Sequence, residues 1–449
     1  MIPNVFSLSC DIIGQANSSG YRLFLKVNKV AGMLSDAILA AQPLFAIGIY
    51  LTFLIGNPPL WISWCIALIP WVLRFWHTKK LTERTPFDIP ILIFTIGIII
   101  GFFVSPNKDI SWQGLHTYIA SILVYYGIIN NRNAKANYWL AIGGVICFIF
   151  IGLTIFTFSQ GDNRLYFFNE WIYNLPKIFP KIDDLLPSYN TTGAFLGTAI
   201  PFLLALVLFQ KHSRLRVWAI TIFILFSILL FLIGSGGGWL SAIIGTIFIL
   251  SCWKIWTLFI TLPAFGVSSW VVITSLNKAS TLASTWVATM FPLSDVESRI
   301  RFWRETGNLL KDHLFSGLGI GSWHDLYAAQ VGHALVNPHN TYLQLYSDTG
   351  LLGGLAVIIA AVVFIYICWN TLHSSIKRDW DGIAIGVIGV IIAGMINAVF
   401  EVNISVPLFK GATITGYIAS PFLWVWAAFL VVAYYRLHPE YYKIPIKAG

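Results

Sequence analysis

The feature that most constrains this chain is a series of long apolar runs that recur from residue 37 to residue 435. Most are about 20 residues long, and a helix of that length crosses the hydrocarbon core of a bilayer. The runs are continuous rather than alternating, which favours helices and excludes the period-two pattern of a membrane barrel. With 57% hydrophobic and 10% charged residues, the chain lies far outside the soluble globular norm. The sequence therefore predicts an all-α, polytopic membrane protein.

We predict about 12 transmembrane helices within a single integral membrane domain, residues 1–449. Their expected ranges are 37–56, 58–76, 87–105, 114–130, 138–158, 191–209, 217–234, 239–253, 256–273, 351–369, 382–400 and 419–435. The other segments are an amphipathic, cytoplasmic lead-in at residues 1–35, two polar loops at residues 159–190 and 274–350, and a cytoplasmic tail at residues 436–449. An even number of spans places both termini on the same side of the membrane.

The formal net charge of +9 is explained by topology rather than by a nucleic-acid partner, which we do not predict. Basic residues cluster in alternate connections, as the positive-inside rule expects of cytoplasmic loops. The clusters are Lys79, Lys80 and Arg84; Arg132 and Lys135; Lys211, Arg214 and Arg216; Lys377 and Arg378; Arg436 and Lys443. The same rule places the two long polar loops on the outer face of the membrane.

The larger outer loop has a pattern of helices and turns. Ile300, Trp303, Leu309 and Leu310 recur at near-helical spacing, which predicts an amphipathic helix on the membrane surface. The glycine-rich run at residues 317–321 predicts a flexible turn. A second helix is expected after His339, leading into the next span.

The arginines of this loop have two interpretations. Arg299, Arg301 and Arg304 could form an interfacial face whose side chains reach lipid phosphates. Alternatively, they could clamp a diphosphate substrate, because guanidinium pairs bidentately with phosphate oxygens at any working pH.

His339 also has two interpretations. It could cap the following helix or complete a polar network, which is the usual role of an isolated histidine. Alternatively, it could act as a general base, since imidazole titrates near neutrality. His333 is the closest competitor for that role, whereas His313 and His324 lie well upstream.

We expect no metal or cofactor site. No HExxH motif, Cys/His ligand spacing, phosphate-binding loop or dinucleotide fingerprint is present, and the five cysteines are scattered. Asp183–Asp184 and Asp295 with Glu297 could bind a divalent ion, but adjacent acids in loops are more often solvated. The apolar runs carry few charges apart from Glu401. This scarcity argues against an ion-coupled transporter but does not exclude one.

Taken together, the motifs of the larger loop resemble the O-antigen ligase/polymerase superfamily. The resemblance covers Ser298–Trp303, Gly317–Gly321, His339–Gln344 and Asp348–Gly353. The superfamily pattern has an arginine four residues before a tryptophan, a glycine-rich turn, a histidine–asparagine pair and an acidic residue before a glycine-rich helix start. This chain departs from the pattern at Ser235-Gly236-Gly237, where the superfamily has serine–arginine–glycine.

The resemblance implies a metal-independent glycosyltransferase of the GT-C type in the bacterial inner membrane. Such enzymes move a glycan from undecaprenyl diphosphate, on the outer face, to an acceptor hydroxyl. The acceptor belongs to lipid A-core in ligases, to a second lipid-linked repeat in polymerases, and to protein serine or threonine in other relatives. We favour a ligase, with a repeat-unit polymerase as the alternative. A bicarbonate-type solute transporter and a non-catalytic scaffold are the alternatives from other classes.

The resemblance also implies roles for individual residues. Arg164, in the first outer loop, and Arg299 match the two functional arginines of the superfamily, and His339 matches its histidine. Arg164 and Arg299, with Arg301, are expected to hold the diphosphate. His339 is expected to orient or deprotonate the acceptor hydroxyl, and direct displacement predicts inversion at the anomeric carbon.

Overall fold

The computed structural model describes residues 34–46, 60–131, 189–210, 213–233, 235–276, 293–331, 338–377, 382–400 and 421–438. The predicted span at residues 138–158, the candidate Arg164 and the alternative base His333 lie outside these ranges. The chain divides into two compact units, Met1–Glu83 and Arg84–Gly449.

In the first unit, α3 (Leu60–Thr78) matches the span predicted at residues 58–76. Its last turns are held by polar contacts. Arg74 Nη2 lies 2.7 Å from Glu83 Oε1, and His77 Nε2 lies 2.8 Å from the Ser35 hydroxyl. Lys79, directly after the helix, has a left-handed backbone with φ of 56°, which ends the helix before the basic loop.

The described elements of the second unit are all helical. They are α4 (Asp88–Val104), α5 (Lys108–Asn130), α8 (Tyr189–Phe209), α9 (Ser213–Ile233), α10 (Gly236–Trp253), the short 3-10 segment η3 (Ile255–Thr257), α11 (Leu258–Leu276), α13 (Leu293–Leu310), α14 (Trp323–Val331), α15 (Thr341–Lys377), α16 (Gly382–Phe400) and α17 (Pro421–Leu437). Most predicted spans are reproduced to within a few residues. Helix α5 begins earlier than predicted because Asn107 caps it, accepting the Ile110 N–H at 3.3 Å.

Four described helices contain a segment long and apolar enough to cross a membrane: Arg214–Phe231, Gly236–Trp253, Thr341–Ser374 and Gly382–Phe400. Shorter apolar segments occur at Asp88–Val104, Gly193–Phe209, Ile255–Val267 and Leu423–Leu437. The all-helical membrane fold is therefore confirmed, and the total of about 12 spans stays a prediction.

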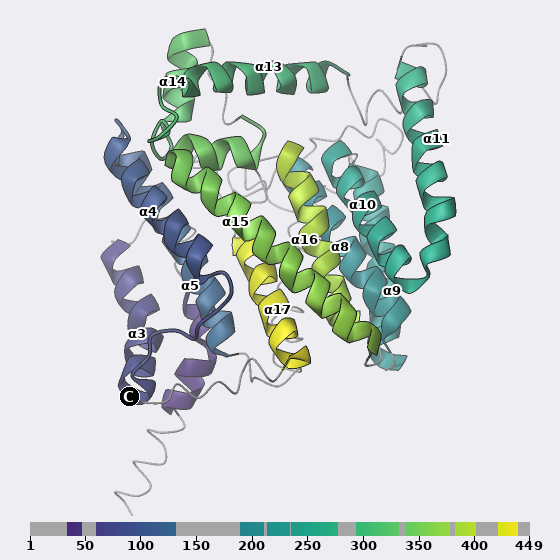
Figure 1. The fold of residues 1–449 in the computed structure, drawn as a ribbon, viewed down its shortest axis with the longest axis horizontal. Helices are drawn as coiled ribbons and strands as arrows, with labels where there is room; N and C mark the ends of the chain where they lie inside the picture. The colour runs from purple at the N-terminus through teal and green to yellow at the C-terminus, as the bar shows by residue number, and fades with distance from the viewer. Residues whose placement is uncertain are drawn as a thin grey trace, which may run out of the picture. The chain divides into compact units, whose positions relative to one another are not determined.

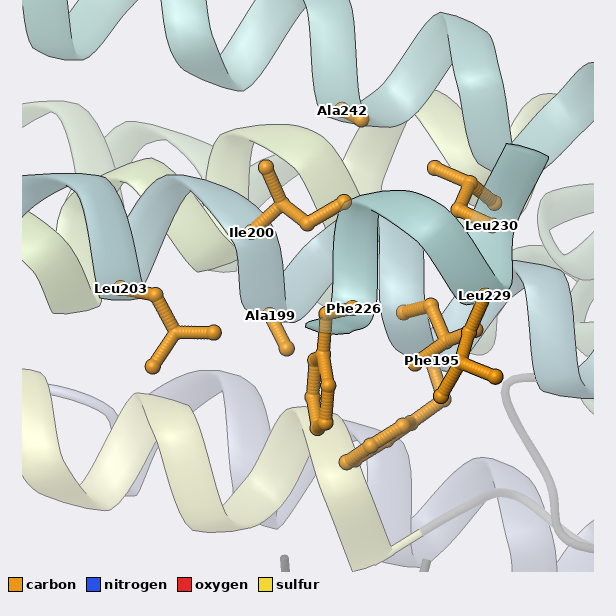
Figure 2. Close-up of a cluster of buried hydrophobic side chains, with 9 residues drawn as sticks. Phe195, Ala199, Ile200, Leu203, Phe226, Leu229, Leu230 and Ala242 are labelled. Atoms are coloured by element: carbon orange, nitrogen blue, oxygen red, sulfur yellow. The ribbon is translucent and has the colours of Figure 1, made fainter. Parts of the chain in front are cut away.

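Helix α8 lies at the centre of the second unit, in contact with α9, α10 and α16. Figure 2 shows the apolar cluster that α8 forms with α9 and α10, in which Phe195 and Phe226 lie 6.1 Å apart between ring centroids. A Cβ on Gly197 would overlap the backbone of Gly238, so glycine allows α8 and α10 to approach closely. Such small-residue contacts are typical of helices that pack within a membrane.

Several helices of the second unit have a terminus with basic residues at the same end of the unit, which we term the basic end. Tyr435 donates to the backbone oxygen of Arg84 at 3.1 Å, and Arg216 Nε donates to the backbone oxygen of Val207 at 2.9 Å. His438, after α17, lies 2.9 Å from the Ser374 hydroxyl near the end of α15. Figure 1 shows the ends of α9, α15 and α17 together on this side. Arg84, Arg216 and Arg436 thus lie at or near one end of the second unit.

Candidate functional site

The opposite end of the second unit, which we term the site end, carries the larger predicted outer loop. Figure 1 shows α13 lying across the ends of the bundle helices, with α14 beside it. Trp303 of α13 packs on Phe400, the last residue of α16, with ring centroids 6.3 Å apart. The predicted surface helix is therefore present, and it lies against the end of the bundle farthest from the basic connections.

His339 lies in a turn, residues 338–340, that leads into α15; we term it the His339 turn. Its backbone is left-handed, with φ of 50°, a conformation that non-glycine residues rarely adopt. The helix cap is the next residue, because Asn340 Oδ1 accepts the Leu343 N–H at 3.0 Å. Asn340 is buried and His339 is half-buried. Capping of α15 thus falls to Asn340 and not to His339.

Two contacts hold α13 against the His339 turn. Trp303 Nε1 donates to the backbone oxygen of Pro338 at 3.1 Å. The ring of Phe302 stacks on the ring of His339, with centroids 6.3 Å apart and an interplanar angle of 28°. A third contact fixes the start of α15, since the Tyr342 hydroxyl donates to the backbone oxygen of Met395 in α16 at 2.9 Å. The imidazole is therefore positioned by α13 and α16 together.

The arginines of α13 differ in their relation to this turn. At about 100° per residue, Arg299 falls between Phe302 and Trp303 around the helix, the two residues that contact the His339 turn. Arg299 is half-buried, whereas Arg301 and Arg304 are exposed. The Arg301 guanidinium lies 5.5 Å from the centroid of the Phe302 ring. The structure therefore brings Arg299 to the His339 face of α13, whereas Arg301 starts about 160° around the helix from Arg299 and reaches back only to the ring of Phe302.

An aromatic cluster between α13 and α14 was not predicted from the sequence. Trp323 and Tyr327 of α14 stack with ring centroids 4.5 Å apart, and Trp323 Nε1 donates to the Thr306 hydroxyl at 3.0 Å. The Tyr327 hydroxyl donates to the Glu305 carboxylate. Burial and this hydrogen bond raise the pKa of Tyr327, so it remains a donor at physiological pH. In the sequence, Trp323 and Tyr327 lie one helical turn apart, and this spacing could have indicated that their rings share one helix face.

The glycine-rich run, residues 317–321, is a buried turn rather than a loose connection; we term it the glycine turn. Gly317, Gly319 and Gly321 all have positive φ, which glycine adopts without a steric cost. The Leu318 N–H donates to the backbone oxygen of Ser347 at 2.7 Å, and the Ile320 N–H donates to that of Gly101 at 3.1 Å. The turn thus joins the end of α4 to the first turns of α15.

The hydrogen bond from Leu318 to Ser347 accompanies a break within α15. Gly350 has φ of 62° and ψ of −150°, outside the helical range. The Leu351 N–H, which in a regular helix would donate to Ser347, donates instead to the backbone oxygen of Phe315 at 3.2 Å. The helix therefore consists of a lead limb, residues 341–349, and a long second limb, residues 351–377. The predicted start of a span at residue 351 coincides with this break.

Of the other candidate histidines, His313 and His324 are described, and neither lies at the His339 turn. His313 is exposed beyond the end of α13, and His324 lies 3.0 Å from Asp325 on α14. No group of three or more His, Cys, Asp or Glu side chains suited to a metal ion occurs within the described ranges. The position of Asp183–Asp184 lies outside those ranges.

Replacing Trp303 with phenylalanine tests the contact between α13 and the His339 turn. The ring is kept, but the Pro338 oxygen loses its donor, so we expect a loss of about 1 kcal/mol in unfolding free energy. Thermal unfolding in detergent, followed by intrinsic fluorescence, measures the change. Trp218, a 66% exposed residue of α9, provides the matched control, since its replacement with phenylalanine should stay within about 0.5 kcal/mol. Equal effects of the two substitutions would contradict the prediction.

Comparison with known proteins agrees with this geometry. Residues 221–358 match the family model described as O-antigen ligase. No curated protein matches the chain. The matched segment contains α13, the glycine turn, the His339 turn and the break in α15. Residues 221–358 are therefore similar to the O-antigen ligase family, which confirms the resemblance of this chain to the O-antigen ligase/polymerase superfamily.

Proposed function

We propose that the protein is an O-antigen ligase-like glycosyltransferase that moves a glycan from undecaprenyl diphosphate to an acceptor hydroxyl. The observation that carries the proposal is the contact between α13 and the His339 turn, on the face of α13 to which Arg299 belongs. Phe302 and Trp303 flank Arg299 on α13 and both contact the His339 turn. A fixed cation and a titratable base on one face fit a reaction that releases a diphosphate and consumes a hydroxyl proton.

The distribution of charge supports placing this reaction on the outer face of the inner membrane. Arg84, Arg216 and Arg436 lie at or near the basic end, and the positive-inside rule assigns such an end to the cytoplasm. The site end then faces the periplasm, where a lipid-linked glycan carried across the membrane presents its diphosphate.

In the proposed step, the acceptor oxygen attacks the anomeric carbon of the glycan. A new glycosidic C–O bond forms while the C–O bond to the diphosphate breaks. His339 takes the acceptor proton, and undecaprenyl diphosphate leaves with the electron pair of the broken bond. Arg299, with Arg301 and with Arg164 from the first outer loop, stabilises the negative charge that develops on the leaving group. Displacement in one step inverts the anomeric configuration, and the step involves no metal.

A transfer assay tests the proposal and separates the alternatives. The purified protein in lipid nanodiscs is supplied with an undecaprenyl-diphosphate glycan and either a lipid A-core acceptor or a second lipid-linked repeat. Transfer to lipid A-core in the presence of EDTA supports the ligase, whereas chain extension of the lipid-linked repeat identifies a polymerase. Uptake of bicarbonate by proteoliposomes, without glycan transfer to either acceptor, would contradict the glycosyltransferase proposal.

Arg299 provides the sharpest test of diphosphate binding. Replacement with alanine is expected to lower kcat/KM for transfer by about 100- to 1,000-fold, as expected for loss of one stabilising group. Replacement with lysine keeps the charge but loses the bidentate geometry, so an intermediate loss is expected. Arg304 is the matched control, because it is exposed and lies about 140° around α13 from Arg299. Arg304→Ala should stay within about threefold of the wild-type protein, and equal losses at both positions would contradict a specific role for Arg299.

A further inference from the structure

A buried carboxylate lies near the end of the lead limb that begins at the His339 turn. Asp348 is 0% exposed. Its carboxylate accepts hydrogen bonds from the Tyr118 hydroxyl at 2.7 Å, from Gln344 Nε2 at 2.9 Å and from the Gly321 N–H at 3.2 Å. One donor comes from α5, one from the glycine turn and one from the lead limb itself. Asp348 therefore joins three segments that are distant in the sequence.

Burial of an acid among apolar helices is costly unless donors satisfy its oxygens. Here Asp348 Oδ1 receives two donors and Oδ2 receives one. Because these contacts are all to the protein and the side chain has no exposed surface, Asp348 is not placed to touch a substrate. Its hydrogen bonds instead hold the lead limb against α5 and the glycine turn.

The break in α15 at Gly350, two residues after Asp348, explains why the lead limb requires these hydrogen bonds. At Gly350 the helix loses its Leu351–Ser347 hydrogen bond, and the two groups bond instead to Phe315 and Leu318. A helix broken in this way can change the angle between its two limbs. The bonds of Asp348 to Gly321 and Tyr118 hold the lead limb in one orientation beside the break.

We propose that Asp348 is a positioning residue for His339, which acts by fixing the angle of the lead limb. This inference rests on the proposed function. The limb spans about 13 Å at a rise of 1.5 Å per residue. A tilt of about 5° at the break therefore moves its far end by about 1 Å, and a displacement of that size can cost about 100-fold in rate.

Three variants test the inference by their kinetics. Asp348→Ala removes all three contacts, and we expect kcat for transfer to fall by about 10- to 100-fold. KM for the lipid-linked donor should change less than about twofold, because Arg299 is untouched. Asp348→Asn keeps an acceptor oxygen for Gly321 and Gln344, and the Tyr118 hydroxyl can accept from the new amide, so kcat should recover to within about threefold of the wild-type value.

Thr349→Val provides the matched control. Thr349 is the adjacent buried residue, and its hydroxyl donates only within the lead limb, to the backbone oxygen of Leu345. Valine has nearly the same shape, so this variant should keep the wild-type kcat. A loss equal to that of Asp348→Ala would overturn the inference, since it would assign the effect to general packing of the limb.

Hydrogen–deuterium exchange of the same proteins gives a readout that does not depend on catalysis. Asp348→Ala should raise exchange in residues 315–322 and 341–351 and leave α8 and α16 unchanged. Wild-type protection in both segments, or an unchanged kcat, would overturn the inference. If Asp348→Ala does not fold, Tyr118→Phe removes a single donor and should show the same changes at smaller size; wild-type behaviour of Tyr118→Phe would then overturn it. Absence of transfer by the wild-type protein would refute the proposed function, while the exchange data would still decide whether Asp348 fixes the limb.

Discussion

Replacement of His339 with asparagine is expected to abolish glycan transfer without unfolding the protein. Removal of a general base commonly costs about 100- to 10,000-fold in rate. Asparagine is the informative choice because the backbone of His339 has φ of 50°, which asparagine tolerates better than alanine does. The turn is thus kept while the titratable ring is lost. The measurements are kcat for transfer and the thermal unfolding midpoint of the same preparation.

His324 is the matched control for this substitution. It belongs to the same outer loop but lies beside Asp325 on α14, so His324→Asn should retain at least half of the wild-type kcat. Retention of most activity by His339→Asn would show that the base lies elsewhere, and His333, the nearest competitor in the sequence, would be the next position to test.

Gly350→Ala is expected to give a large loss of stability. With φ of 62° and ψ of −150°, this residue occupies a region that is nearly closed to other amino acids. A Cβ there would also overlap the Phe315 oxygen and lie close to the Gly317 nitrogen. Backbone strain and overpacking together predict a loss of about 3–5 kcal/mol. Size-exclusion chromatography after graded heating measures the fraction that remains monodisperse.

Gly307→Ala is the control for that substitution. Gly307 lies within α13, and no atom approaches the position of its Cβ within 4 Å. Alanine favours helix over glycine by up to about 1 kcal/mol, so the variant should be as stable as the wild-type protein or slightly more stable. If Gly350→Ala matches Gly307→Ala, then the break in α15 is not required for folding.

The positions of most helices could be predicted from the sequence because the bilayer sets their length and composition. The span predicted at residues 382–400 coincides with α16. The surface helix was also predictable, since the spacing of Ile300 and Trp303 matches a helix with one apolar face. These features depend on local periodicity, which the sequence displays directly.

The break in α15 could not be predicted in the same way. Residue 351 was expected to begin a span, but the hydrogen bonds that stabilise the break come from Phe315 and Leu318 in an earlier loop. The meeting of α13 with the His339 turn likewise depends on a bond between residues 35 positions apart, from Trp303 to Pro338. Such tertiary contacts have no local signature. Functional roles for Arg299 and His339 in one site were expected through the resemblance to a known superfamily.

The exchange of hydrogen bonds at Gly350 also sets limits on how this protein can be recombined with its relatives. The Phe315 oxygen and the Leu318 N–H supply the acceptor and the donor that Leu351 and Ser347 of α15 lack. An insertion of one residue between Phe315 and Leu318 would change the spacing of these two groups, so that both bonds to α15 could not form together. A chimera that exchanges the segment around α13 and α14 must therefore transplant residues 315–322 together with residues 341–351 as one unit, with its junctions elsewhere in the chain.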